Sequence, residues 1–334
     1  MKNGEIYPPY TVGVDLGGTN TELAVVDAVG HIIARDSFPT AVPKRGAENS
    51  DSSPVVGDWA DELATRINRM IRESGLEERI EGIGIGAPCA NAVTGCIEAA
   101  TDLPWPSPIA LANMMESRLG IPVTVSNDAN AAAIGEMTYG AAAGLKNFIV
   151  LTLGTGVGSG IVCDGHLMTG ARGFAGELGH VTFPFADDRL CGCGRHGCLQ
   201  TVASAKGIRL TAKRLLSDTE RQSSLRDIPE KDMSPKVIEQ AARNGDPLAA
   251  EVYEFTGRCL GLAAAEFAAF TDPEAIILFG GVSKAGDLLL EPMRKAFHDA
   301  ALHLYRDRVR FLLSGVSDSD AAILGAASLP FIKI

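Results

Sequence analysis

Short apolar runs that end in glycine or a polar residue alternate with longer segments whose apolar positions recur every three or four residues. The short runs predict strands, and the longer segments predict helices. Strands are predicted at 10–15, 23–27, 32–38, 80–87, 121–125, 148–153, 161–163, 166–168, 276–279 and 309–313. Helices are predicted at 59–75, 109–119, 129–136, 199–216, 237–243, 247–270, 286–305 and 320–329, with a polar connection at 217–235. This order predicts an α/β protein of two domains.

Two glycine-rich turns follow strands in a similar way. D-L-G-G-T-N occupies 15–20, and L-G-T-G-V-G-S-G begins at Leu153. A second strand and a Gly-His pair follow each turn, at 30–31 and 165–166. Repetition of such a unit suggests two similar halves packed across a cleft.

The glycine-rich turns are candidates for phosphate binding, because backbone N–H groups can approach an anion where no Cβ intervenes. Asp15 would repel a phosphate unless Mg²⁺ lay between them. Together with G-G-V at 280–282, the turns favour nucleotide phosphates and Mg²⁺ over simple tight turns. The chain lacks G-x4-G-K-[ST], and no G-x-G-x-x-G opens a helix after its first strand, so neither a P-loop nor a dinucleotide fold is expected.

Asn127 and Asp128 lie where the strand at 121–125 gives way to a helix. Ligands of α/β folds bind at such strand ends. Asp128 is therefore the best candidate for a general base that accepts a hydroxyl proton, and the amides of Asn127 and Asn130 could orient a polyol. The alternative is that Asn127 or Asp128 only caps the helix.

Four soft metal ligands occur within a short stretch: His180, Cys191, Cys193 and Cys198. Three thiolates and one imidazole suit tetrahedral zinc. His196 is an alternative fourth ligand. Glu177 and His180 could also face a substrate, so zinc is expected to be a scaffold for a loop that recognises a ligand.

Composition narrows the class of protein. The 334 residues suit about two domains, and 46% hydrophobic with 21% charged residues predict a sizeable core. A net charge of −11 argues against a broad nucleic-acid-binding face. Seven cysteines, of which three are in the cluster, indicate a reducing compartment. No apolar signal region or long apolar run occurs, so a cytoplasmic protein without a membrane partner is expected.

Several motifs together resemble the ROK family of repressors, uncharacterised frames and sugar kinases, in the actin/hexokinase-like superfamily. They are D-L-G-G-T-N, I-G-I-G-A-P, N-D-A-N-A-A-A, L-G-T-G-V-G-S-G, G-E-L-G-H and C-G-C-G-R-H-G-C. The resemblance implies a two-domain, ribonuclease H-like fold with a ligand cleft between the domains. A smaller domain would comprise 1–126 and about 314–334, with the last helix returning to it, and a larger domain with the zinc loop would comprise 127–313.

The resemblance also implies ATP-dependent phosphorylation of a hexose, most simply glucose, at its 6-hydroxyl, with Asp128 as the base. The implied sugar ligands are Asn127, Asp128, Glu177, His180 and Gln200, with His180 binding zinc through its other ring nitrogen. The implied phosphate and Mg²⁺ groups are Asp15, Gly17, Gly18, Thr19, Gly154, Thr155 and Gly156, with Gly280 and Gly281 beside the adenosine.

Three residues depart from the family pattern. Gln200 stands where the family has a glutamate that bonds the sugar, and Cys89 and Asp102 replace glycine and asparagine. These departures leave the identity of the sugar open. The alternatives are an N-acetylhexosamine or mannose kinase of the same family, or a sugar-binding protein without catalysis. A repressor would need a DNA-binding helix-turn-helix before the first glycine-rich motif. Because that motif begins at Asp15, too few residues are expected for such a domain. A homodimer is expected.

Overall fold

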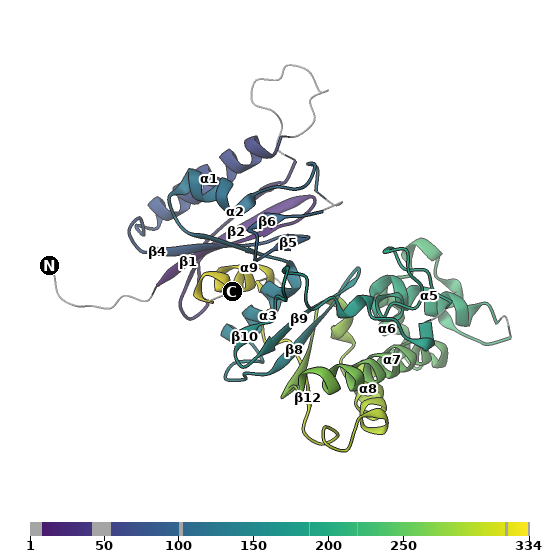
Figure 1. Cartoon of the computed structure of the whole chain (residues 1–334). Coiled ribbons are helices and arrows are strands. Elements are labelled where there is room, and N and C mark those ends of the chain that lie inside the picture. Colours follow the sequence, from purple (N-terminus) through teal and green to yellow (C-terminus); the bar gives the residue numbers. More distant parts are fainter. Residues whose placement is uncertain are drawn as a thin grey trace. The chain divides into compact units, whose positions relative to one another are not determined.

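The computed structural model describes residues 9–41, 55–99, 103–186, 188–218, 220–317 and 320–332. The chain forms two compact units (Figure 1). The first unit comprises Met1–Ala143, His166–Ala175 and Gly315–Ile334, and the second comprises Gly144–Gly165 and Gly176–Ser314. The chain therefore passes from one unit to the other after residues 143, 165, 175 and 314.

The first unit is built on a sheet with the strand order β3-β2-β1-β4-β7. Its strands are β1 (Tyr10–Leu16), β2 (Asn20–Asp27), β3 (Ile32–Pro39), β4 (Ile80–Gly86) and β7 (Val123–Ser126). Strands β1, β2 and β3 are antiparallel neighbours, whereas β1, β4 and β7 run parallel. The carboxyl ends of these three parallel strands consequently share one edge of the sheet. A small hairpin of β5 (Ala90–Asn91) and β6 (Cys96–Ile97) follows β4.

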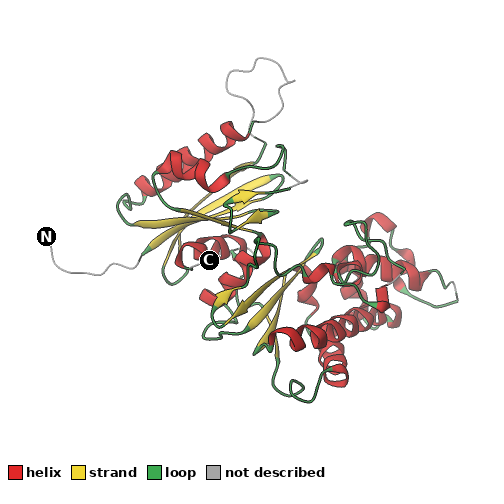
Figure 2. Ribbon diagram, viewed as in Figure 1, coloured by secondary structure: helices red, strands yellow, loops and turns green. Residues whose placement is uncertain are grey.

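Helices cover both faces of this sheet, as Figures 1 and 2 show. Helices α1 (Val56–Glu73) and α2 (Leu111–Leu119) lie on one face, and α3 (Asp128–Tyr139) and α9 (Ala321–Ser328) lie on the other. In α1, Trp59, Leu63 and Ile67 recur at helical spacing and are fully buried. The apolar stripe in the sequence therefore faces the sheet.

Glycines allow α9 to lie directly on the strands. A Cβ on Gly13 would come within 2.3 Å of the Ile323 carbonyl oxygen, and one on Gly84 would come within 1.8 Å of the Ala326 oxygen. Helix α3 in turn packs on α9, where a Cβ on Gly135 would lie 2.9 Å from the Gly325 Cα. This packing groups residues 127–143 with the first unit, whereas the sequence division assigns them to the second domain.

The second unit repeats the arrangement of hairpin and parallel strands. Strands β8 (Phe148–Leu153) and β9 (Val157–Cys163) are antiparallel, and β8, β11 (Ala275–Phe279) and β12 (Arg310–Leu313) run parallel. Strand β10 (His166–Leu167) follows β9 along the chain. The hairpin beside a parallel strand is thus common to both units, as the repeated sequence pattern predicts.

The described part of the second unit also contains the α-helices α4 (Gln200–Ala203), α5 (Ala205–Leu216), α6 (Pro235–Arg243), α7 (Pro247–Thr271) and α8 (Asp287–Ala300). Helices α7 and α8 lie side by side (Figure 1). A Cβ on Gly261 would come within 2.3 Å of the Met293 oxygen, so glycine in α7 permits the close approach.

Some boundaries differ from the sequence prediction. The helix predicted at 199–216 is broken at Ser204, whose backbone is extended (ψ 169°) and whose hydroxyl accepts the Gly207 N–H. Strand β9 already begins at Val157, so the second glycine turn is shorter than predicted. The connection at 217–235 contains two 3₁₀ turns and is anchored by Asp246, which accepts bonds from Ser223 and Ser224.

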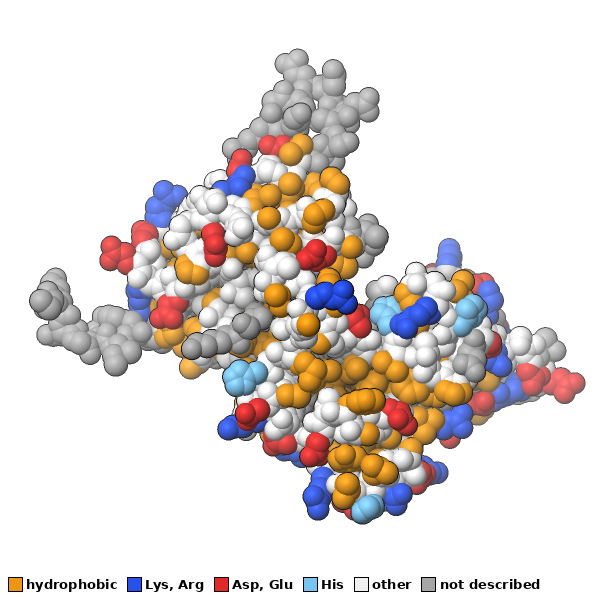
Figure 3. All heavy atoms as spheres, in the orientation of Figure 1, with side chains coloured by type: hydrophobic (Ala, Val, Ile, Leu, Met, Phe, Trp, Pro, Cys, Tyr) orange, Lys and Arg blue, Asp and Glu red, His pale blue; other side chains and the backbone are white. Residues whose placement is uncertain are grey.

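Acidic and basic side chains are interspersed on the visible face of each unit (Figure 3). Among the residues that the structure describes, no helix combines the length and apolar character needed to cross a membrane.

Candidate active site and metal centre

The first unit places two carboxylates near one edge of its sheet. In the parallel register Asp15 lies opposite Gly86, and Gly86 lies opposite Ser126. Asp128 follows two residues after Ser126, in the first turn of α3. The Asp128 carboxyl is close enough to raise the pKa of Asp15. The end of a strand and the start of a helix therefore bring together two acids that are distant in sequence.

Partial desolvation makes both carboxyl groups harder to ionise. The pKa of Asp15 rises from 3.8 to about 6, first because the carboxyl is desolvated and then because Asp128 and Glu22 are negative. Desolvation also raises the pKa of Asp128, although the Ala129 N–H bonds its carboxylate at 2.8 Å and opposes this shift. A raised pKa makes a carboxylate a stronger base, which suits proton abstraction from a hydroxyl.

The N-cap of α3 is Asn127, so the Asp128 carboxylate is not needed to cap the helix. The Asn127 side-chain oxygen accepts the Asn130 N–H at 2.7 Å. The Asp128 carboxylate accepts the adjacent Ala129 N–H at 2.8 Å, and the residue is exposed to solvent. The capping interpretation is thus correct for Asn127 and does not account for Asp128.

The first glycine turn is a short reversal between β1 and β2. The Gly17 N–H donates to the Asn20 carbonyl at 3.0 Å, and the Thr40 hydroxyl donates to the Gly17 carbonyl at 2.7 Å. Gly18 and Thr19 are exposed at its tip. The turn is therefore fixed at its base and open to solvent at its tip.

The second glycine turn joins β8 to β9. The Gly154 N–H donates to the Gly156 carbonyl at 3.0 Å, while the Ala205 N–H donates to the Gly154 carbonyl at 2.8 Å. Gly280, at the end of β11, has φ 95°, and a Cβ there would lie 2.8 Å from the Leu153 oxygen. The Gly154–Gly156 turn and Gly280 therefore lie close together at one edge of the second sheet.

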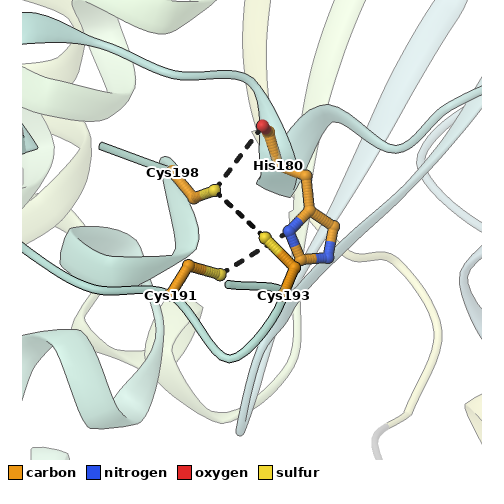
Figure 4. Close-up of side chains that lie close together, drawn as sticks. All are labelled: His180, Cys191, Cys193 and Cys198. Carbon is orange, nitrogen blue, oxygen red and sulfur yellow. Dashed lines mark hydrogen bonds between the residues drawn. The ribbon is translucent and has the colours of Figure 1, made fainter. Parts of the chain in front are cut away.

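The four predicted metal ligands converge. The ligand atoms of His180, Cys191, Cys193 and Cys198 all lie within 4.8 Å of one another. Figure 4 shows the His180 Nδ1 turned toward the sulfurs and Nε2 turned away. The Cys191 Sγ lies 3.7 Å from His180 Nδ1, and the Cys193 and Cys198 sulfurs are 3.7 Å apart.

This donor set fits zinc. Zn–S bonds of about 2.3 Å in a tetrahedron place two sulfurs roughly 3.8 Å apart, which agrees with the pair at 3.7 Å. Gly194 (φ 86°) and Gly197 (φ 81°) let the loop reverse around the cluster. His196 is exposed and outside the group of four, so within the described chain the imidazole of the cluster is that of His180.

The surroundings of the thiols are unequal. The backbone N–H of Arg195 lowers the pKa of Cys193 to about 6, whereas burial raises the pKa of Cys198 to about 12. The Arg195 guanidinium also donates to the His180 carbonyl at 2.6 Å. The positive Arg195 guanidinium therefore lies beside the cluster and favours the thiolate form of Cys193.

The G-E-L-G-H segment is fixed to β9. The Leu178 N–H donates to the Ser159 hydroxyl at 3.1 Å, and that hydroxyl also bonds the Gly176 carbonyl. A Cβ on Gly179 would come within 2.0 Å of the Val157 oxygen, so only glycine fits there. Glu177 is exposed beside this fixed segment, and is therefore free to meet a ligand.

Two contributors were not singled out from the sequence. Ser159, noted only as part of a glycine-rich turn, anchors the G-E-L-G-H segment. Arg189, two residues before Cys191, is buried and donates to the Thr201 carbonyl at 2.7 Å and to the Thr211 hydroxyl at 2.9 Å. Arg189 follows two aspartates and comes two residues before Cys191, so its local sequence gives no signal for this clamp.

The predicted residues thus fall into two groups, one in each unit. The first unit holds Asp15, Gly17, Gly18, Thr19, Asn127 and Asp128, and the second holds Gly154, Thr155, Gly156, Glu177, His180, Gln200, Gly280, Gly281 and the three cysteines. Cys89 is exposed with φ 53°, and Asp102 lies outside the described residues.

Nearly the whole chain matches a known family. The profile of the ROK family matches residues 11–331, so the chain belongs to the ROK family. Its α/β fold is that of solved ROK sugar kinases, which have the actin/hexokinase-like architecture.

Particular relatives are similar over nearly their full length. The chain is 37% identical to a glucokinase of Halalkalibacterium halodurans, over 96% of this chain and 94% of that protein. It is 33% identical to the ROK family glucokinase of Streptomyces griseus, solved in complex with glucose and AMPPNP, with a TM-score of 0.72 over 96% of this chain and 98% of that one. It is also 30% identical to a putative xylose repressor of a Caldicellulosiruptor species, over 95% of this chain and 77% of that protein.

Proposed function

We propose that this protein transfers the γ-phosphoryl group of ATP to the 6-hydroxyl of a hexose, with glucose as the preferred substrate. The observation that supports this best is Asp128, a desolvated carboxylate in the first turn of α3, beside Asp15 and not used as the helix cap. The similarity to glucokinases over nearly the full chain agrees with the proposal.

In this proposal Asp128 accepts the proton of the attacking hydroxyl. Phosphoryl transfer depends mainly on positioning and on neutralising charge, so a carboxylate held in line is sufficient as the base. Asp15 would bind the Mg²⁺ that enters with ATP. A divalent cation beside Asp15 also relieves the repulsion from Asp128 and Glu22, which adds to desolvation in raising the pKa of Asp15.

The second unit would hold the phosphates and the remaining sugar contacts. The backbone of Gly154–Gly156 would donate to phosphate oxygens, and Gly280 and Gly281 would border the adenosine. Glu177 and His180 would bond hydroxyl groups of the hexose. Zinc held by His180 Nδ1 and the three cysteines would fix the loop and leave Nε2–H as a donor.

Replacing the base tests the reaction type. We expect Asp128→Asn to lower the turnover number by about 10²–10⁴-fold, because the amide cannot accept the proton. Asp232→Asn, the same chemical change at an exposed position, serves as the control. Turnover is measured as ADP release in a coupled assay, with hexose binding followed by calorimetry. Unchanged turnover in Asp128→Asn would rule out this role.

A sugar panel tests the substrate. We expect glucose to give the highest kcat/KM among glucose, mannose, N-acetylglucosamine and N-acetylmannosamine, and 6-deoxyglucose to give no ADP release above background. A preference for an N-acetylhexosamine or for mannose would change the substrate and keep the reaction. Saturable sugar binding without ADP release from any of them would identify a sugar-binding protein.

A further inference from the structure

Gln200, the first residue of α4, lies between the metal cluster and the second glycine turn. Its side-chain Nε2 donates to the Cys191 sulfur at 2.9 Å. Its side-chain Oε1 accepts the backbone N–H of Val157 at 3.4 Å. Both ends of the amide therefore contact elements of the second unit.

The amide is chemically suited to this position. A glutamine presents two N–H donors and one carbonyl acceptor, whereas a glutamate that is ionised only accepts. A metal-bound thiolate accepts hydrogen bonds and is negative, so a donor beside it is favourable and a carboxylate is not. The donor at Cys191 and the acceptor at Val157 together require an amide.

The turn itself is shaped around this side chain. A Cβ on Gly156 would come within 3.0 Å of the Gln200 Oε1, so glycine makes room for it. On the other side of the turn, the Ala205 N–H donates to the Gly154 carbonyl at 2.8 Å. The chain at 200–205 therefore holds the Gly154–Val157 segment at both of its ends.

The same chain segment is also connected to the metal loop. The Thr201 hydroxyl and N–H both donate to the Cys198 carbonyl, at 2.7 and 2.9 Å. The ligand Cys198 precedes Gln200 by two residues, and the ligand Cys191 accepts its amide. Displacement of either thiol would therefore be transmitted to the glycine turn through one side chain.

We propose that Gln200 is a positioning residue that ties the zinc loop to the phosphate-binding turn, and that it is not a ligand of the sugar. The phosphate part of this statement rests on the proposed function. Zinc binding and nucleotide binding are then coupled through Gln200, and thermodynamic linkage makes the coupling reciprocal.

Two substitutions separate the contacts. Gln200→Leu removes the donor and the acceptor, whereas Gln200→Glu keeps an acceptor for Val157 and places a negative charge at Cys191. Gln240→Leu, on the exposed face of α6, is the matched control, since its amide bonds only the neighbouring Asn244 among the contacts that the structure describes. Gln200→Glu preserves the side-chain shape, so it keeps the test valid if Gln200→Leu does not fold.

The primary measurement is the affinity for zinc, by competition with a chelator, together with the spectrum of the cobalt-substituted protein. We expect both Gln200 variants to bind zinc about 10-fold or more weakly. We also expect their thiolate-to-cobalt charge-transfer bands to shift, because the hydrogen bond to a ligand sulfur is lost. Gln240→Leu should match the wild type in both measurements.

The second measurement is the binding of AMPPNP and of glucose to the zinc-loaded protein by calorimetry. We expect Gln200→Leu to bind AMPPNP roughly 5-fold or more weakly, and to bind glucose alone with unchanged affinity. Wild-type zinc affinity and cobalt spectra in both variants, with glucose binding lost, would overturn the proposal and make Gln200 a sugar ligand. If the wild type bound neither AMPPNP nor glucose, the proposed function would fail, while the zinc and cobalt measurements would still decide whether Gln200 supports the metal.

Discussion

The Asp15 carboxyl lies where a negative charge is unfavourable in the absence of a ligand. Desolvation, Asp128 and Glu22 raise its pKa from 3.8 to about 6. An acid with a raised pKa is ionised more easily in the unfolded chain. As the pH rises from about 4 through 6, the unfolded state loses this proton first, so the free energy of unfolding falls across that window and the penalty then persists at higher pH.

We therefore expect Asp15→Asn to stabilise the ligand-free protein by about 1–2 kcal/mol at pH 7.5, a value reduced from the full pKa shift because solvent screens part of it. Near pH 4 the variant and the wild type should be equally stable. Urea unfolding at both pH values measures this, with Asp232→Asn as the control. An equal loss of stability at both pH values would show that the carboxylate is structural.

The donor atoms of the site could be predicted from residue types, but their partners could not. Histidine and three cysteines identify a metal cluster wherever the loop lies, because few other functions use that set. The contact of Gln200 with Val157 joins residues 43 apart in sequence. This contact depends on how α4 packs against the β8–β9 turn, and no local sequence pattern predicts that packing.

At the scale of elements, glycines decide how closely α9 can pack. A Cβ on Gly325 would lie 2.6 Å from the Ala131 oxygen and 3.2 Å from the Ala132 nitrogen of α3. Neither neighbour is the flexible end of a side chain, because both atoms belong to the backbone. A methyl group at this position must therefore push the two helices apart.

We expect Gly325→Ala to lower the free energy of unfolding by about 1–3 kcal/mol through overpacking. Gly57→Ala is the matched change in α1, where the only atom near a new Cβ is the Val55 Cγ1 at 4.0 Å. It should be neutral or stabilise by up to about 1 kcal/mol, because alanine favours helix. Thermal and urea unfolding of both variants check this, and equal effects would contradict the packing argument.

Most elements, though fewer boundaries, could be predicted from the sequence. The apolar spacing of α1 and α7 identifies both helices, because α1 buries one face and α7 buries more than half of its residues. The break at Ser204 could not be predicted, because helical periodicity continues across it. Ser204 becomes the N-cap of α5 because its hydroxyl accepts the Gly207 N–H. The start of β9 could not be predicted, because the local sequence V-G-S-G is typical of a turn. Pairing with β8 makes this segment a strand.

At the scale of the whole molecule, Glu136 holds together two of the places where the chain leaves the first unit. Its carboxylate is buried, with 1% of the residue exposed. It accepts the Ala141 N–H at 2.7 Å and the Gly315 N–H at 3.1 Å. Both partners lie near points where the chain passes from one unit to the other, after residues 143 and 314.

We expect Glu136→Leu to lower the free energy of unfolding by roughly 2–4 kcal/mol, because it removes the charged acceptor that two backbone N–H groups share. Glu136→Gln retains one oxygen and should cost less than half as much. Urea unfolding of the two variants measures the difference. Equal losses in both would show that charge, and not the shared acceptor, is what these points in the chain require.

The position of α9 has a consequence for the order in which the protein folds during synthesis. The Thr11 hydroxyl bonds the Ala327 carbonyl, 316 residues away. At about 5–20 residues per second, a ribosome needs on the order of 15–60 s to add that length of chain. Strands β1 and β2 therefore leave the ribosome long before their covering helix exists, whereas the second unit is complete at Ser314. The part of the protein that is made first is the part that finishes folding last.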